Sequence, residues 1–133
     1  MTPQQIELVQ TSFKKVVPIA GTAADLFYDG LFEIAPDVRS LFPQDLSEQK
    51  TKLMGMLGTA VGSLHQLDTI LPAVKELGKR HVGYGVKPEH YALVGGALLW
   101  TLEKGLGADF TPEVKTAWTE TYTSLAGVMN GAA

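Results

Sequence analysis

Apolar residues recur at intervals of three and four along most of the chain, with polar residues between them. The first run begins at Pro3, and its apolar positions are Ile6, Val9, Phe13 and Val16. Thr2 precedes this run and Gln5 stands three residues after Thr2, a pair typical of a capping box. The pattern therefore predicts a helix that starts directly after Thr2.

Further helical runs follow, separated by proline and glycine. All seven prolines stand where a helix could start or has just ended. A short helical turn is expected between Pro36 and Pro43, and Gly107 is expected to end a long helix. The longer helices are expected over residues 22–34, 47–68, 72–81, 88–106 and from 112 onward. Because no strand pair, repeat or linker interrupts them, the sequence predicts an all-α fold with one domain over residues 1–133.

Two of these predicted helices carry distinctive patterns. In 22–34, the residues on two adjacent faces are apolar, so the helix should be buried on two sides. Those residues are Phe27, Leu31 and Ile34 on one face and Tyr28 and Phe32 on the other. In 47–68, Gly55, Gly58 and Gly62 each cost about 0.8–1 kcal/mol of helix propensity relative to alanine. We therefore expect that something in the fold needs a close approach at these glycines.

Composition excludes several kinds of function. The chain has 133 residues, 45% of them hydrophobic, and a formal net charge of −3, so it should fold and has no basic footprint for nucleic acid. It has no cysteine, which excludes disulfides, thiolate nucleophiles, iron–sulfur ligation and cysteine-type zinc sites. The polar start and the lack of an apolar run near ~18 residues predict a cytoplasmic protein without membrane insertion. Any metal must be held by nitrogen or oxygen.

One of three histidines lies in the stretch LGKRHVGYGV, residues 77–86. His81 could be an ordinary helix cap, because an imidazolium near a helix C-terminus is favourable. It could also be an axial ligand of a buried metal cofactor. The predicted helices 47–68 and 72–81 should form an antiparallel corner with about four residues between them, so that Gln49, Leu53 and Leu57 face His81 across a wedge. Side chains or a cofactor must fill that wedge, because an empty apolar gap is costly.

Several segments occur in an order that resembles a known family. They are LFYDGLF (26–32), PDVRSLF (36–42), the spaced Gln49 and Leu53, LGKRHVGYGV (77–86) and HYALVGGALLW (90–100). The chain resembles the globins, and among them the single-domain bacterial globins related to the haem domain of flavohaemoglobins. The resemblance covers essentially the whole chain. It implies a globin fold, in which helices pack around a haem pocket, with a short third helix and an irregular segment before the distal helix.

The resemblance also implies roles for particular residues. His81 matches the proximal histidine, the one protein ligand to the iron of haem b (iron protoporphyrin IX). Tyr28 and Gln49 match distal residues that would stabilise a bound ligand by hydrogen bonds, although Gln49 could also be a solvated residue of a first helical turn. The other residues expected against the cofactor are Phe42, Leu53, Leu57, Val86, Tyr91 and Val94.

The remaining polar residues near the site give secondary expectations. His65 and His90 are not placed to reach the sixth iron position, so the ferrous iron should be five-coordinate and open. The family often backs its proximal histidine with a tyrosine and a last-helix glutamate, but the sequence ends at Ala133, where that glutamate would be expected. We therefore expect His81 to donate its second N–H to a backbone carbonyl near Leu77. Lys79 or Arg80 could reach a haem propionate.

The leading hypothesis for function is a haem-binding globin. It would bind dioxygen reversibly, for oxygen binding or transport, and take nitric oxide and carbon monoxide as further diatomic ligands. Nitric oxide dioxygenation, the detoxifying conversion to nitrate, would need a separate reductase, because the chain has no dinucleotide-binding GxGxxG fingerprint. Whether the protein is an enzyme stays open at this point. The alternatives are a haem-based gas sensor and, in a third class, a haem-free helical interaction module.

Overall fold

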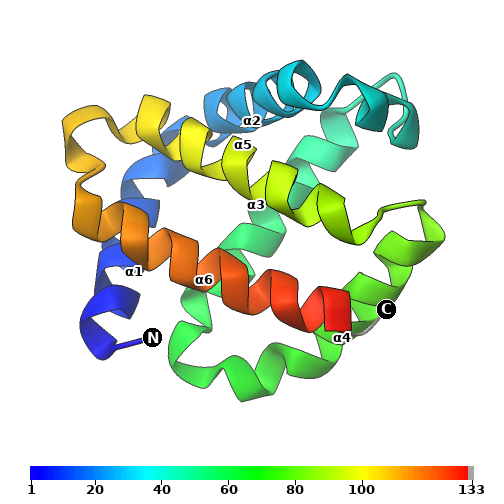
Figure 1. Cartoon of the computed structure of the whole chain (residues 1–133). Coiled ribbons are helices and arrows are strands. Elements are labelled where there is room, and N and C mark those ends of the chain that lie inside the picture. The colour runs from blue at the N-terminus through cyan, green and yellow to red at the C-terminus, as the bar shows by residue number, and fades with distance from the viewer. Residues whose placement is uncertain (132–133) are drawn as a thin grey trace.

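Helices make up nearly all of the computed structural model, which describes residues 1–131 (Figure 1). Ala132 and Ala133, including the place of the expected glutamate, lie outside that range. The α-helices are α1 (Pro3–Val16), α2 (Ala20–Ile34), α3 (Ser47–Gly62), α4 (Leu67–Gly83), α5 (Pro88–Leu106) and α6 (Pro112–Gly131). Short 3₁₀ helices lie between them: η1 (Val17–Ile19), η2 (Pro36–Leu41), η3 (Leu64–Gln66) and η4 (Gly107–Asp109). The predicted all-α class is confirmed.

The helix ends follow the local sequence signals. Thr2 Oγ1 accepts a hydrogen bond from the Gln5 backbone N–H at 3.1 Å, and Gln5 Oε1 accepts one from the Thr2 N–H at 3.0 Å. This reciprocal pair is the predicted capping box, which satisfies two N–H groups that have no partner within α1. At the end of α5, Gly107 adopts a φ of 57°, in the left-handed region that favours glycine. The chain therefore leaves α5 where the sequence predicts.

The boundary between α3 and α4 differs from the prediction. We expected one helix over 47–68 and a second from Pro72, but α3 ends at Gly62 and α4 already begins at Leu67. Pro72 lies inside α4 as its sixth residue. The first four N–H groups of a helix have no intrahelical partner, so a proline two positions later removes only one hydrogen bond. Pro72 is thus the one proline of the seven that marks neither a start nor an end.

The core lies between α1, α2, α5 and α6. In Figure 1, α5 and α6 run antiparallel across the front, and α3 crosses behind them. Trp118 of α6 is 1% exposed, and its Nε1–H donates to Ser12 Oγ of α1 at 2.9 Å. Helix α2 packs against both α5 and α3, which confirms that it is buried on two sides. The prediction that Ile34 is buried is wrong, because this residue, in the last turn of α2, is 52% exposed.

A close approach of other helices to the α3 glycines is not found among residues 1–131. A Cβ added at Gly55 or Gly62 would meet no neighbouring atom within 4 Å, and one at Gly58 would lie 3.8 Å from the ring of Phe13, an ordinary contact. Close approaches occur instead on other helices. A Cβ at Gly30 would lie 2.8 Å from the Trp100 ring, and one at Gly78 would overlap the backbone of Met129. Periodicity alone does not distinguish these two groups of glycines.

Within residues 1–131, every helix is too short or too polar to span a membrane.

Candidate functional site

His81 lies in the last turn of α4, and its imidazole is oriented by the helix itself. Its Nδ1 lies 2.7 Å from the carbonyl oxygen of Leu77, one turn earlier. A carbonyl oxygen can only accept, so Nδ1 carries the proton, and in a neutral ring Nε2 keeps its lone pair. The expected hydrogen bond near Leu77 is therefore present. This arrangement leaves Nε2 available as a metal ligand and fixes the orientation of the ring.

The turn after His81 is tied back to it. The backbone N–H groups of Tyr84 and Val86 both donate to the carbonyl of His81, at 3.1 and 3.0 Å. Gly85 has a φ of 92°, which a residue with a side chain rarely adopts. These bonds return Val86 toward His81. Gly83 is thus the last residue of α4, and Gly85 forms the break between α4 and α5.

Tyr28 lies on α2 in an aromatic cluster. It is 3% exposed, and its ring centroid lies 5.0 Å from that of Phe27, 5.9 Å from Phe32 and 5.7 Å from Phe42. Burial raises the pKa of the Tyr28 phenol above its ordinary value, and the neighbouring Gln49 side chain opposes that rise. The two predicted distal residues are thus brought together, with the phenol held neutral and able to donate.

The start of α3 is anchored so that Gln49 faces Tyr28. The Asp45 carboxylate accepts hydrogen bonds from the Ser47 backbone N–H at 2.9 Å and from its hydroxyl at 2.7 Å, which lowers the pKa of Asp45. Next to Gln49, Lys50 pairs with Asp25 of α2 at 2.8 Å. Gln49 is half-buried and lines a surface pocket of about 340 Å³ with Asp45, among other residues. Gln49 thus contributes to this surface pocket and also affects the pKa of Tyr28.

Phe42 follows η2, and an arginine that was not predicted from the sequence fixes it there. The Arg39 guanidinium donates to the carbonyls of Pro43 at 2.9 Å and Gln44 at 3.1 Å and lies 5.1 Å from the centre of the Phe32 ring. Phe42 packs edge-on against Phe32 at 5.6 Å. A lone arginine in PDVRSLF carries no sequence signal for this role, because its acceptors are backbone carbonyls.

Tyr91 and Val94 lie in the first half of α5, both half-buried. A second residue missed by sequence analysis, Tyr122 of α6, donates its hydroxyl hydrogen to the Tyr91 carbonyl at 2.6 Å. Burial raises the pKa of Tyr122, and its proximity to Tyr91 raises it further. The aromatic ring of Tyr122 also packs over Gly95. Helix α6 thus fixes the start of α5 beside the site.

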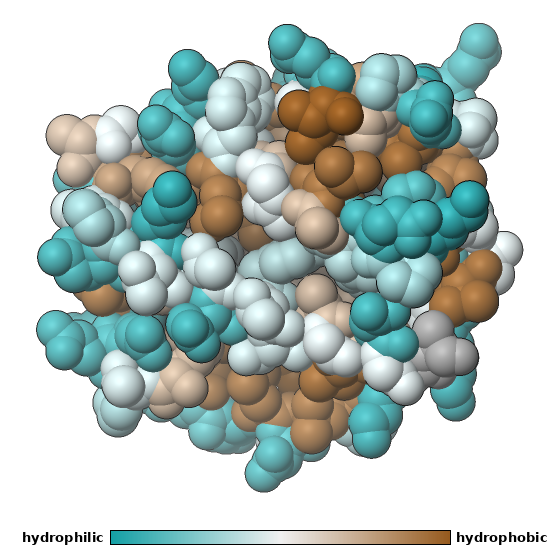
Figure 2. Space-filling view, in the orientation of Figure 1, coloured by the Kyte–Doolittle hydropathy of each residue, from teal (hydrophilic) through white to brown (hydrophobic). Residues whose placement is uncertain are grey.

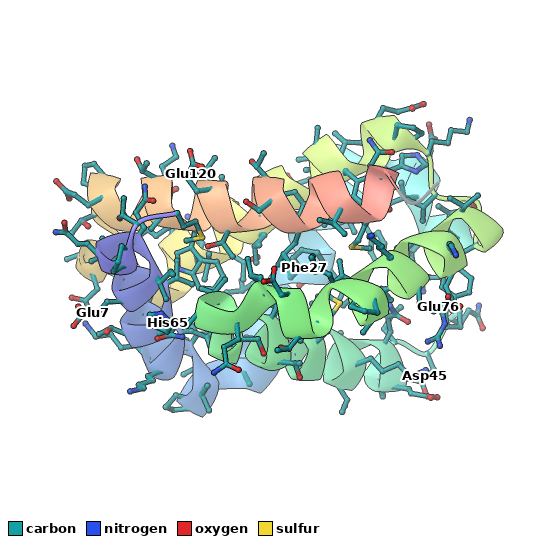
Figure 3. All side chains as sticks on the ribbon, turned by 90° about the horizontal axis from the view of Figure 1, so that it is seen from below. Glu7, Phe27, Asp45, His65, Glu76 and Glu120 are labelled. Atoms are coloured by element: carbon teal, nitrogen blue, oxygen red, sulfur yellow. The ribbon has the colours of Figure 1, made fainter. Side chains whose placement is uncertain are left out.

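The other two histidines lie elsewhere. Figure 3 shows His65 at one end of the molecule, while Asp45, just before α3, and Glu76, in the second half of α4, lie toward the other. The start of α3 and the end of α4 therefore share one end, as expected for an antiparallel corner. His90 Nδ1 accepts a hydrogen bond from the Lys87 backbone N–H at 3.0 Å and takes part in the cap of α5.

The residues present fit a flat apolar cofactor. The seven side chains expected against it are all half-buried, in contrast to the closed core: Phe42, Leu53, Leu57, His81, Val86, Tyr91 and Val94. The large apolar residues of α4 other than the exposed Val82 are half-buried as well, and Gly78 is the one buried residue of that helix. One imidazole nitrogen, apolar walls and a polar pair at Tyr28 are the donor set and lining that an iron porphyrin needs.

A comparison with protein families decides the assignment. The family model described as Globin matches residues 25–129. The chain belongs to the globin family. Since the family binds haem, this globin is a haem-binding protein, and the predicted resemblance is confirmed.

Individual relatives place this globin more closely. The flavohaemoprotein of Bacillus subtilis strain 168 is 32% identical over 129 residues, which cover 95% of this chain and 32% of that protein. Neuroglobin-1 of Oncorhynchus mykiss is 26% identical over 144 residues, covering 98% of this globin and 91% of that one. This globin spans about a third of the length of the flavohaemoproteins it matches.

A solved structure also shares the fold. It is an engineered carbene transferase, a provisionally assigned nitric oxide dioxygenase from Rhodothermus marinus. Its TM-score is 0.88 and its sequence identity 27%, over 98% of this globin and 92% of that chain.

Proposed function

We propose that residues 1–133 form one globin domain that binds haem b through Nε2 of His81 and takes dioxygen, nitric oxide or carbon monoxide on the side of Tyr28 and Gln49. The hydrogen bond from His81 Nδ1 to the Leu77 carbonyl is the observation that carries this proposal, because it leaves Nε2 as the ligating nitrogen. A backbone carbonyl is a neutral acceptor, so it makes the imidazole less electron-rich than a carboxylate would.

The haem iron, when bound, supplies a coordination position for a diatomic gas and the redox chemistry that converts nitric oxide and dioxygen to nitrate. The chain's own residues shape that position. Tyr28 donates a hydrogen bond to the ligand from a desolvated hydroxyl, and the Gln49 amide is a second donor beside it. Leu53 and Leu57 provide apolar surface that keeps water away from this side.

Reversible dioxygen binding is the function that this arrangement supports best. Nitric oxide dioxygenation is the second candidate, because the provisional assignment of the Rhodothermus marinus relative is of that kind. Nitrate formation would leave the iron ferric, so one electron from a reductase would be needed for each turnover. The two activities share one site and differ in whether that electron is supplied.

The first experiment tests the ligand. We expect the purified protein to show a haem Soret band that is lost or displaced in His81→Ala and unchanged in the matched variant His65→Ala, whose side chain is exposed. A folded protein that binds no added haemin would overturn the proposal.

The second experiment tests the distal side. Tyr28→Phe should speed dioxygen dissociation by at least roughly tenfold, since a hydrogen bond to a charged or strongly polarised group contributes ~1.5–3 kcal/mol. Gln49→Leu should have a smaller effect. Laser photolysis or stopped-flow displacement by carbon monoxide measures both rates, and an unchanged rate in Tyr28→Phe would remove Tyr28 from the ligand site.

A third experiment distinguishes a dioxygen carrier from an enzyme. It mixes the dioxygen complex with nitric oxide, with and without a reductant.

A further inference from the structure

Positive charge is concentrated in the segment that contains His81. Residues 75–87 hold four cations and one carboxylate, whereas the other 120 residues hold seven cations and thirteen carboxylates. The four cations are Lys75, Lys79, Arg80 and Lys87, all exposed. None of them forms an ion pair within residues 1–131. The end of α4 is therefore a positive surface on a protein of net negative charge.

Exposed apolar side chains lie within the same segment. Val82 is 49% exposed and Tyr84 is 59% exposed, the largest value among the exposed large hydrophobic residues of residues 1–131. In Figure 2, hydrophobic side chains reach the surface at the right-hand edge, over the end of α4, with hydrophilic side chains beside them. Aromatic and apolar residues surrounded by cations are typical of the centre and rim of a protein interface.

This surface is connected to the proximal histidine. The Tyr84 ring lies 5.8 Å from the His81 ring, centroid to centroid, and the Tyr84 N–H donates to the His81 carbonyl at 3.1 Å. The turn that carries Tyr84 also packs on η2, since a Cβ on Gly85 would lie 3.3 Å from Leu41. An exposed side chain is thus held against the imidazole proposed as the iron ligand.

We propose that Lys75, Lys79, Arg80, Val82, Tyr84 and Lys87 form a docking surface for a separate electron-donor protein with an acidic face, and that Tyr84 is the contact through which its electron reaches His81. The inference rests on the second candidate of the proposed function, nitric oxide dioxygenation, which requires one electron per turnover to return ferric iron to ferrous. In that step the donor's flavin or iron–sulfur cluster loses one electron, the iron gains it, and no covalent bond forms or breaks.

Charge complementarity determines the kind of partner. An acidic donor is attracted to the end of α4 and repelled by the rest of the surface, which is net negative, so encounter is oriented toward Tyr84. The attraction should weaken with salt, because exposed charges are screened over about 10 Å at 0.1 M ionic strength.

The test uses the haem-loaded protein and, as the probe, a [2Fe–2S] ferredoxin with a strongly acidic surface. Isothermal titration with oxidised ferredoxin gives the Kd, and stopped-flow mixing with reduced ferredoxin, followed at the Soret band, gives the rate of electron transfer. We expect Lys75→Glu with Lys87→Glu to weaken binding at least roughly tenfold at low salt. The matched control, Lys14→Glu with Lys115→Glu, reverses two exposed cations on α1 and α6 and should change the Kd less than twofold.

Tyr84 is tested at saturating ferredoxin, where docking no longer limits the rate. Tyr84→Leu should slow reduction severalfold with little change in Kd, and Tyr84→Phe should retain the wild-type rate. Equal Kd values in both charge-reversal pairs would overturn the docking surface, and an unchanged rate in Tyr84→Leu would overturn the electron contact.

The Soret band of each sample reports the cofactor separately. If the protein shows a normal Soret band but does not bind ferredoxin, this inference is overturned and the proposed function stands. If the protein shows no Soret band, the proposed function and the electron route are both overturned. The titration with ferredoxin still tests the docking surface in that case. Vesicles containing phosphatidylglycerol test whether the segment binds an anionic membrane instead. The proposed protein partner would be overturned if the protein bound vesicles but not ferredoxin, and if Lys75→Glu with Lys87→Glu abolished the vesicle binding.

Discussion

The two halves of this globin are packed differently. Helices α1, α2, α5 and α6 each bury five or six residues, and their side chains close over Trp118. Helices α3 and α4 bury only Ala60, Val61 and Gly78. Their apolar side chains, such as Leu53 and Leu77, are half-buried. One half is a conventional core, and the other is an apolar lining.

The difference shows where stability should come from. A core closed by side chains keeps its contacts without any cofactor, whereas an apolar lining reaches full burial only against a bound molecule. Helix α4 is attached to the core mainly through α6 and η3. The helix that carries His81 should therefore depend on haem more than any other.

Removal of haem should have the largest effect, and it tests whether α4 depends on the cofactor more than the core does. A ligand present at a thousand times its Kd stabilises the folded state by about 4 kcal/mol, so local protection from amide exchange should fall by roughly a thousandfold in the apo protein. We expect that loss in α4, measured by hydrogen–deuterium exchange, and a change of less than tenfold around Val9 and Trp118. Equal losses in both halves would contradict the contrast in packing.

Substitutions at two glycines should change the free energy of unfolding in opposite directions. At Gly78 an added Cβ would overlap the Met129 backbone, so Gly78→Ala should lower the free energy of unfolding by about 1–3 kcal/mol and loosen α4 from α6. At Gly55 an added Cβ meets no neighbouring atom, so Gly55→Ala should raise the free energy of unfolding by about 0.8–1 kcal/mol, because alanine has the higher helix propensity. Urea unfolding measures both, and a stabilising Gly78→Ala would show that α4 can shift without cost.

A further expected effect, confined to pH values above about 10, is a loss of stability at alkaline pH. Burial raises the pKa of Tyr28 and of Tyr122 in the folded state, while a tyrosine in the unfolded chain ionises near 10. The unfolded state therefore loses these protons first, so stability is unaffected below about pH 10 and falls above it, by at most about 1.4 kcal/mol per pH unit for each group. Tyr122→Phe should flatten the fall between pH 10 and 11.5, measured by urea unfolding, and the exposed variant Tyr84→Phe should not. An unchanged slope in Tyr122→Phe would show that the phenol ionises freely when folded.

Much of the fold was predictable because its signals are local. The capping box at Thr2 and the stop at Gly107 depend on residues within a few positions. The start of α4 was not predictable in this way, since Pro72 is compatible with the sixth position of a helix as well as with the first. Close contacts such as that of Gly30 with Trp100 depend on residues 70 apart, and helical periodicity carries no information on them.

The candidate site shows the same division. The His81 hydrogen bond to Leu77 is local and was predicted, and the meeting of Tyr28 with Gln49 followed from the family resemblance. Arg39 and Tyr122 were missed because each acts by donating to backbone carbonyls, and a carbonyl acceptor leaves no mark in the sequence. Residues that hold a pocket in place are thus harder to predict than residues that line it.

The contact between Gly78 and Met129 also sets an order in time. Ribosomes add about 5–20 residues per second, so Met129 is made roughly 3–10 s after Gly78. The hydrogen bond between Trp118 and Ser12 spans 106 residues and likewise waits for a residue made long after its partner. The support behind His81 is thus completed only after His81 itself has been made. We therefore expect the nascent chain to hold haem stably only once Met129 has been synthesised.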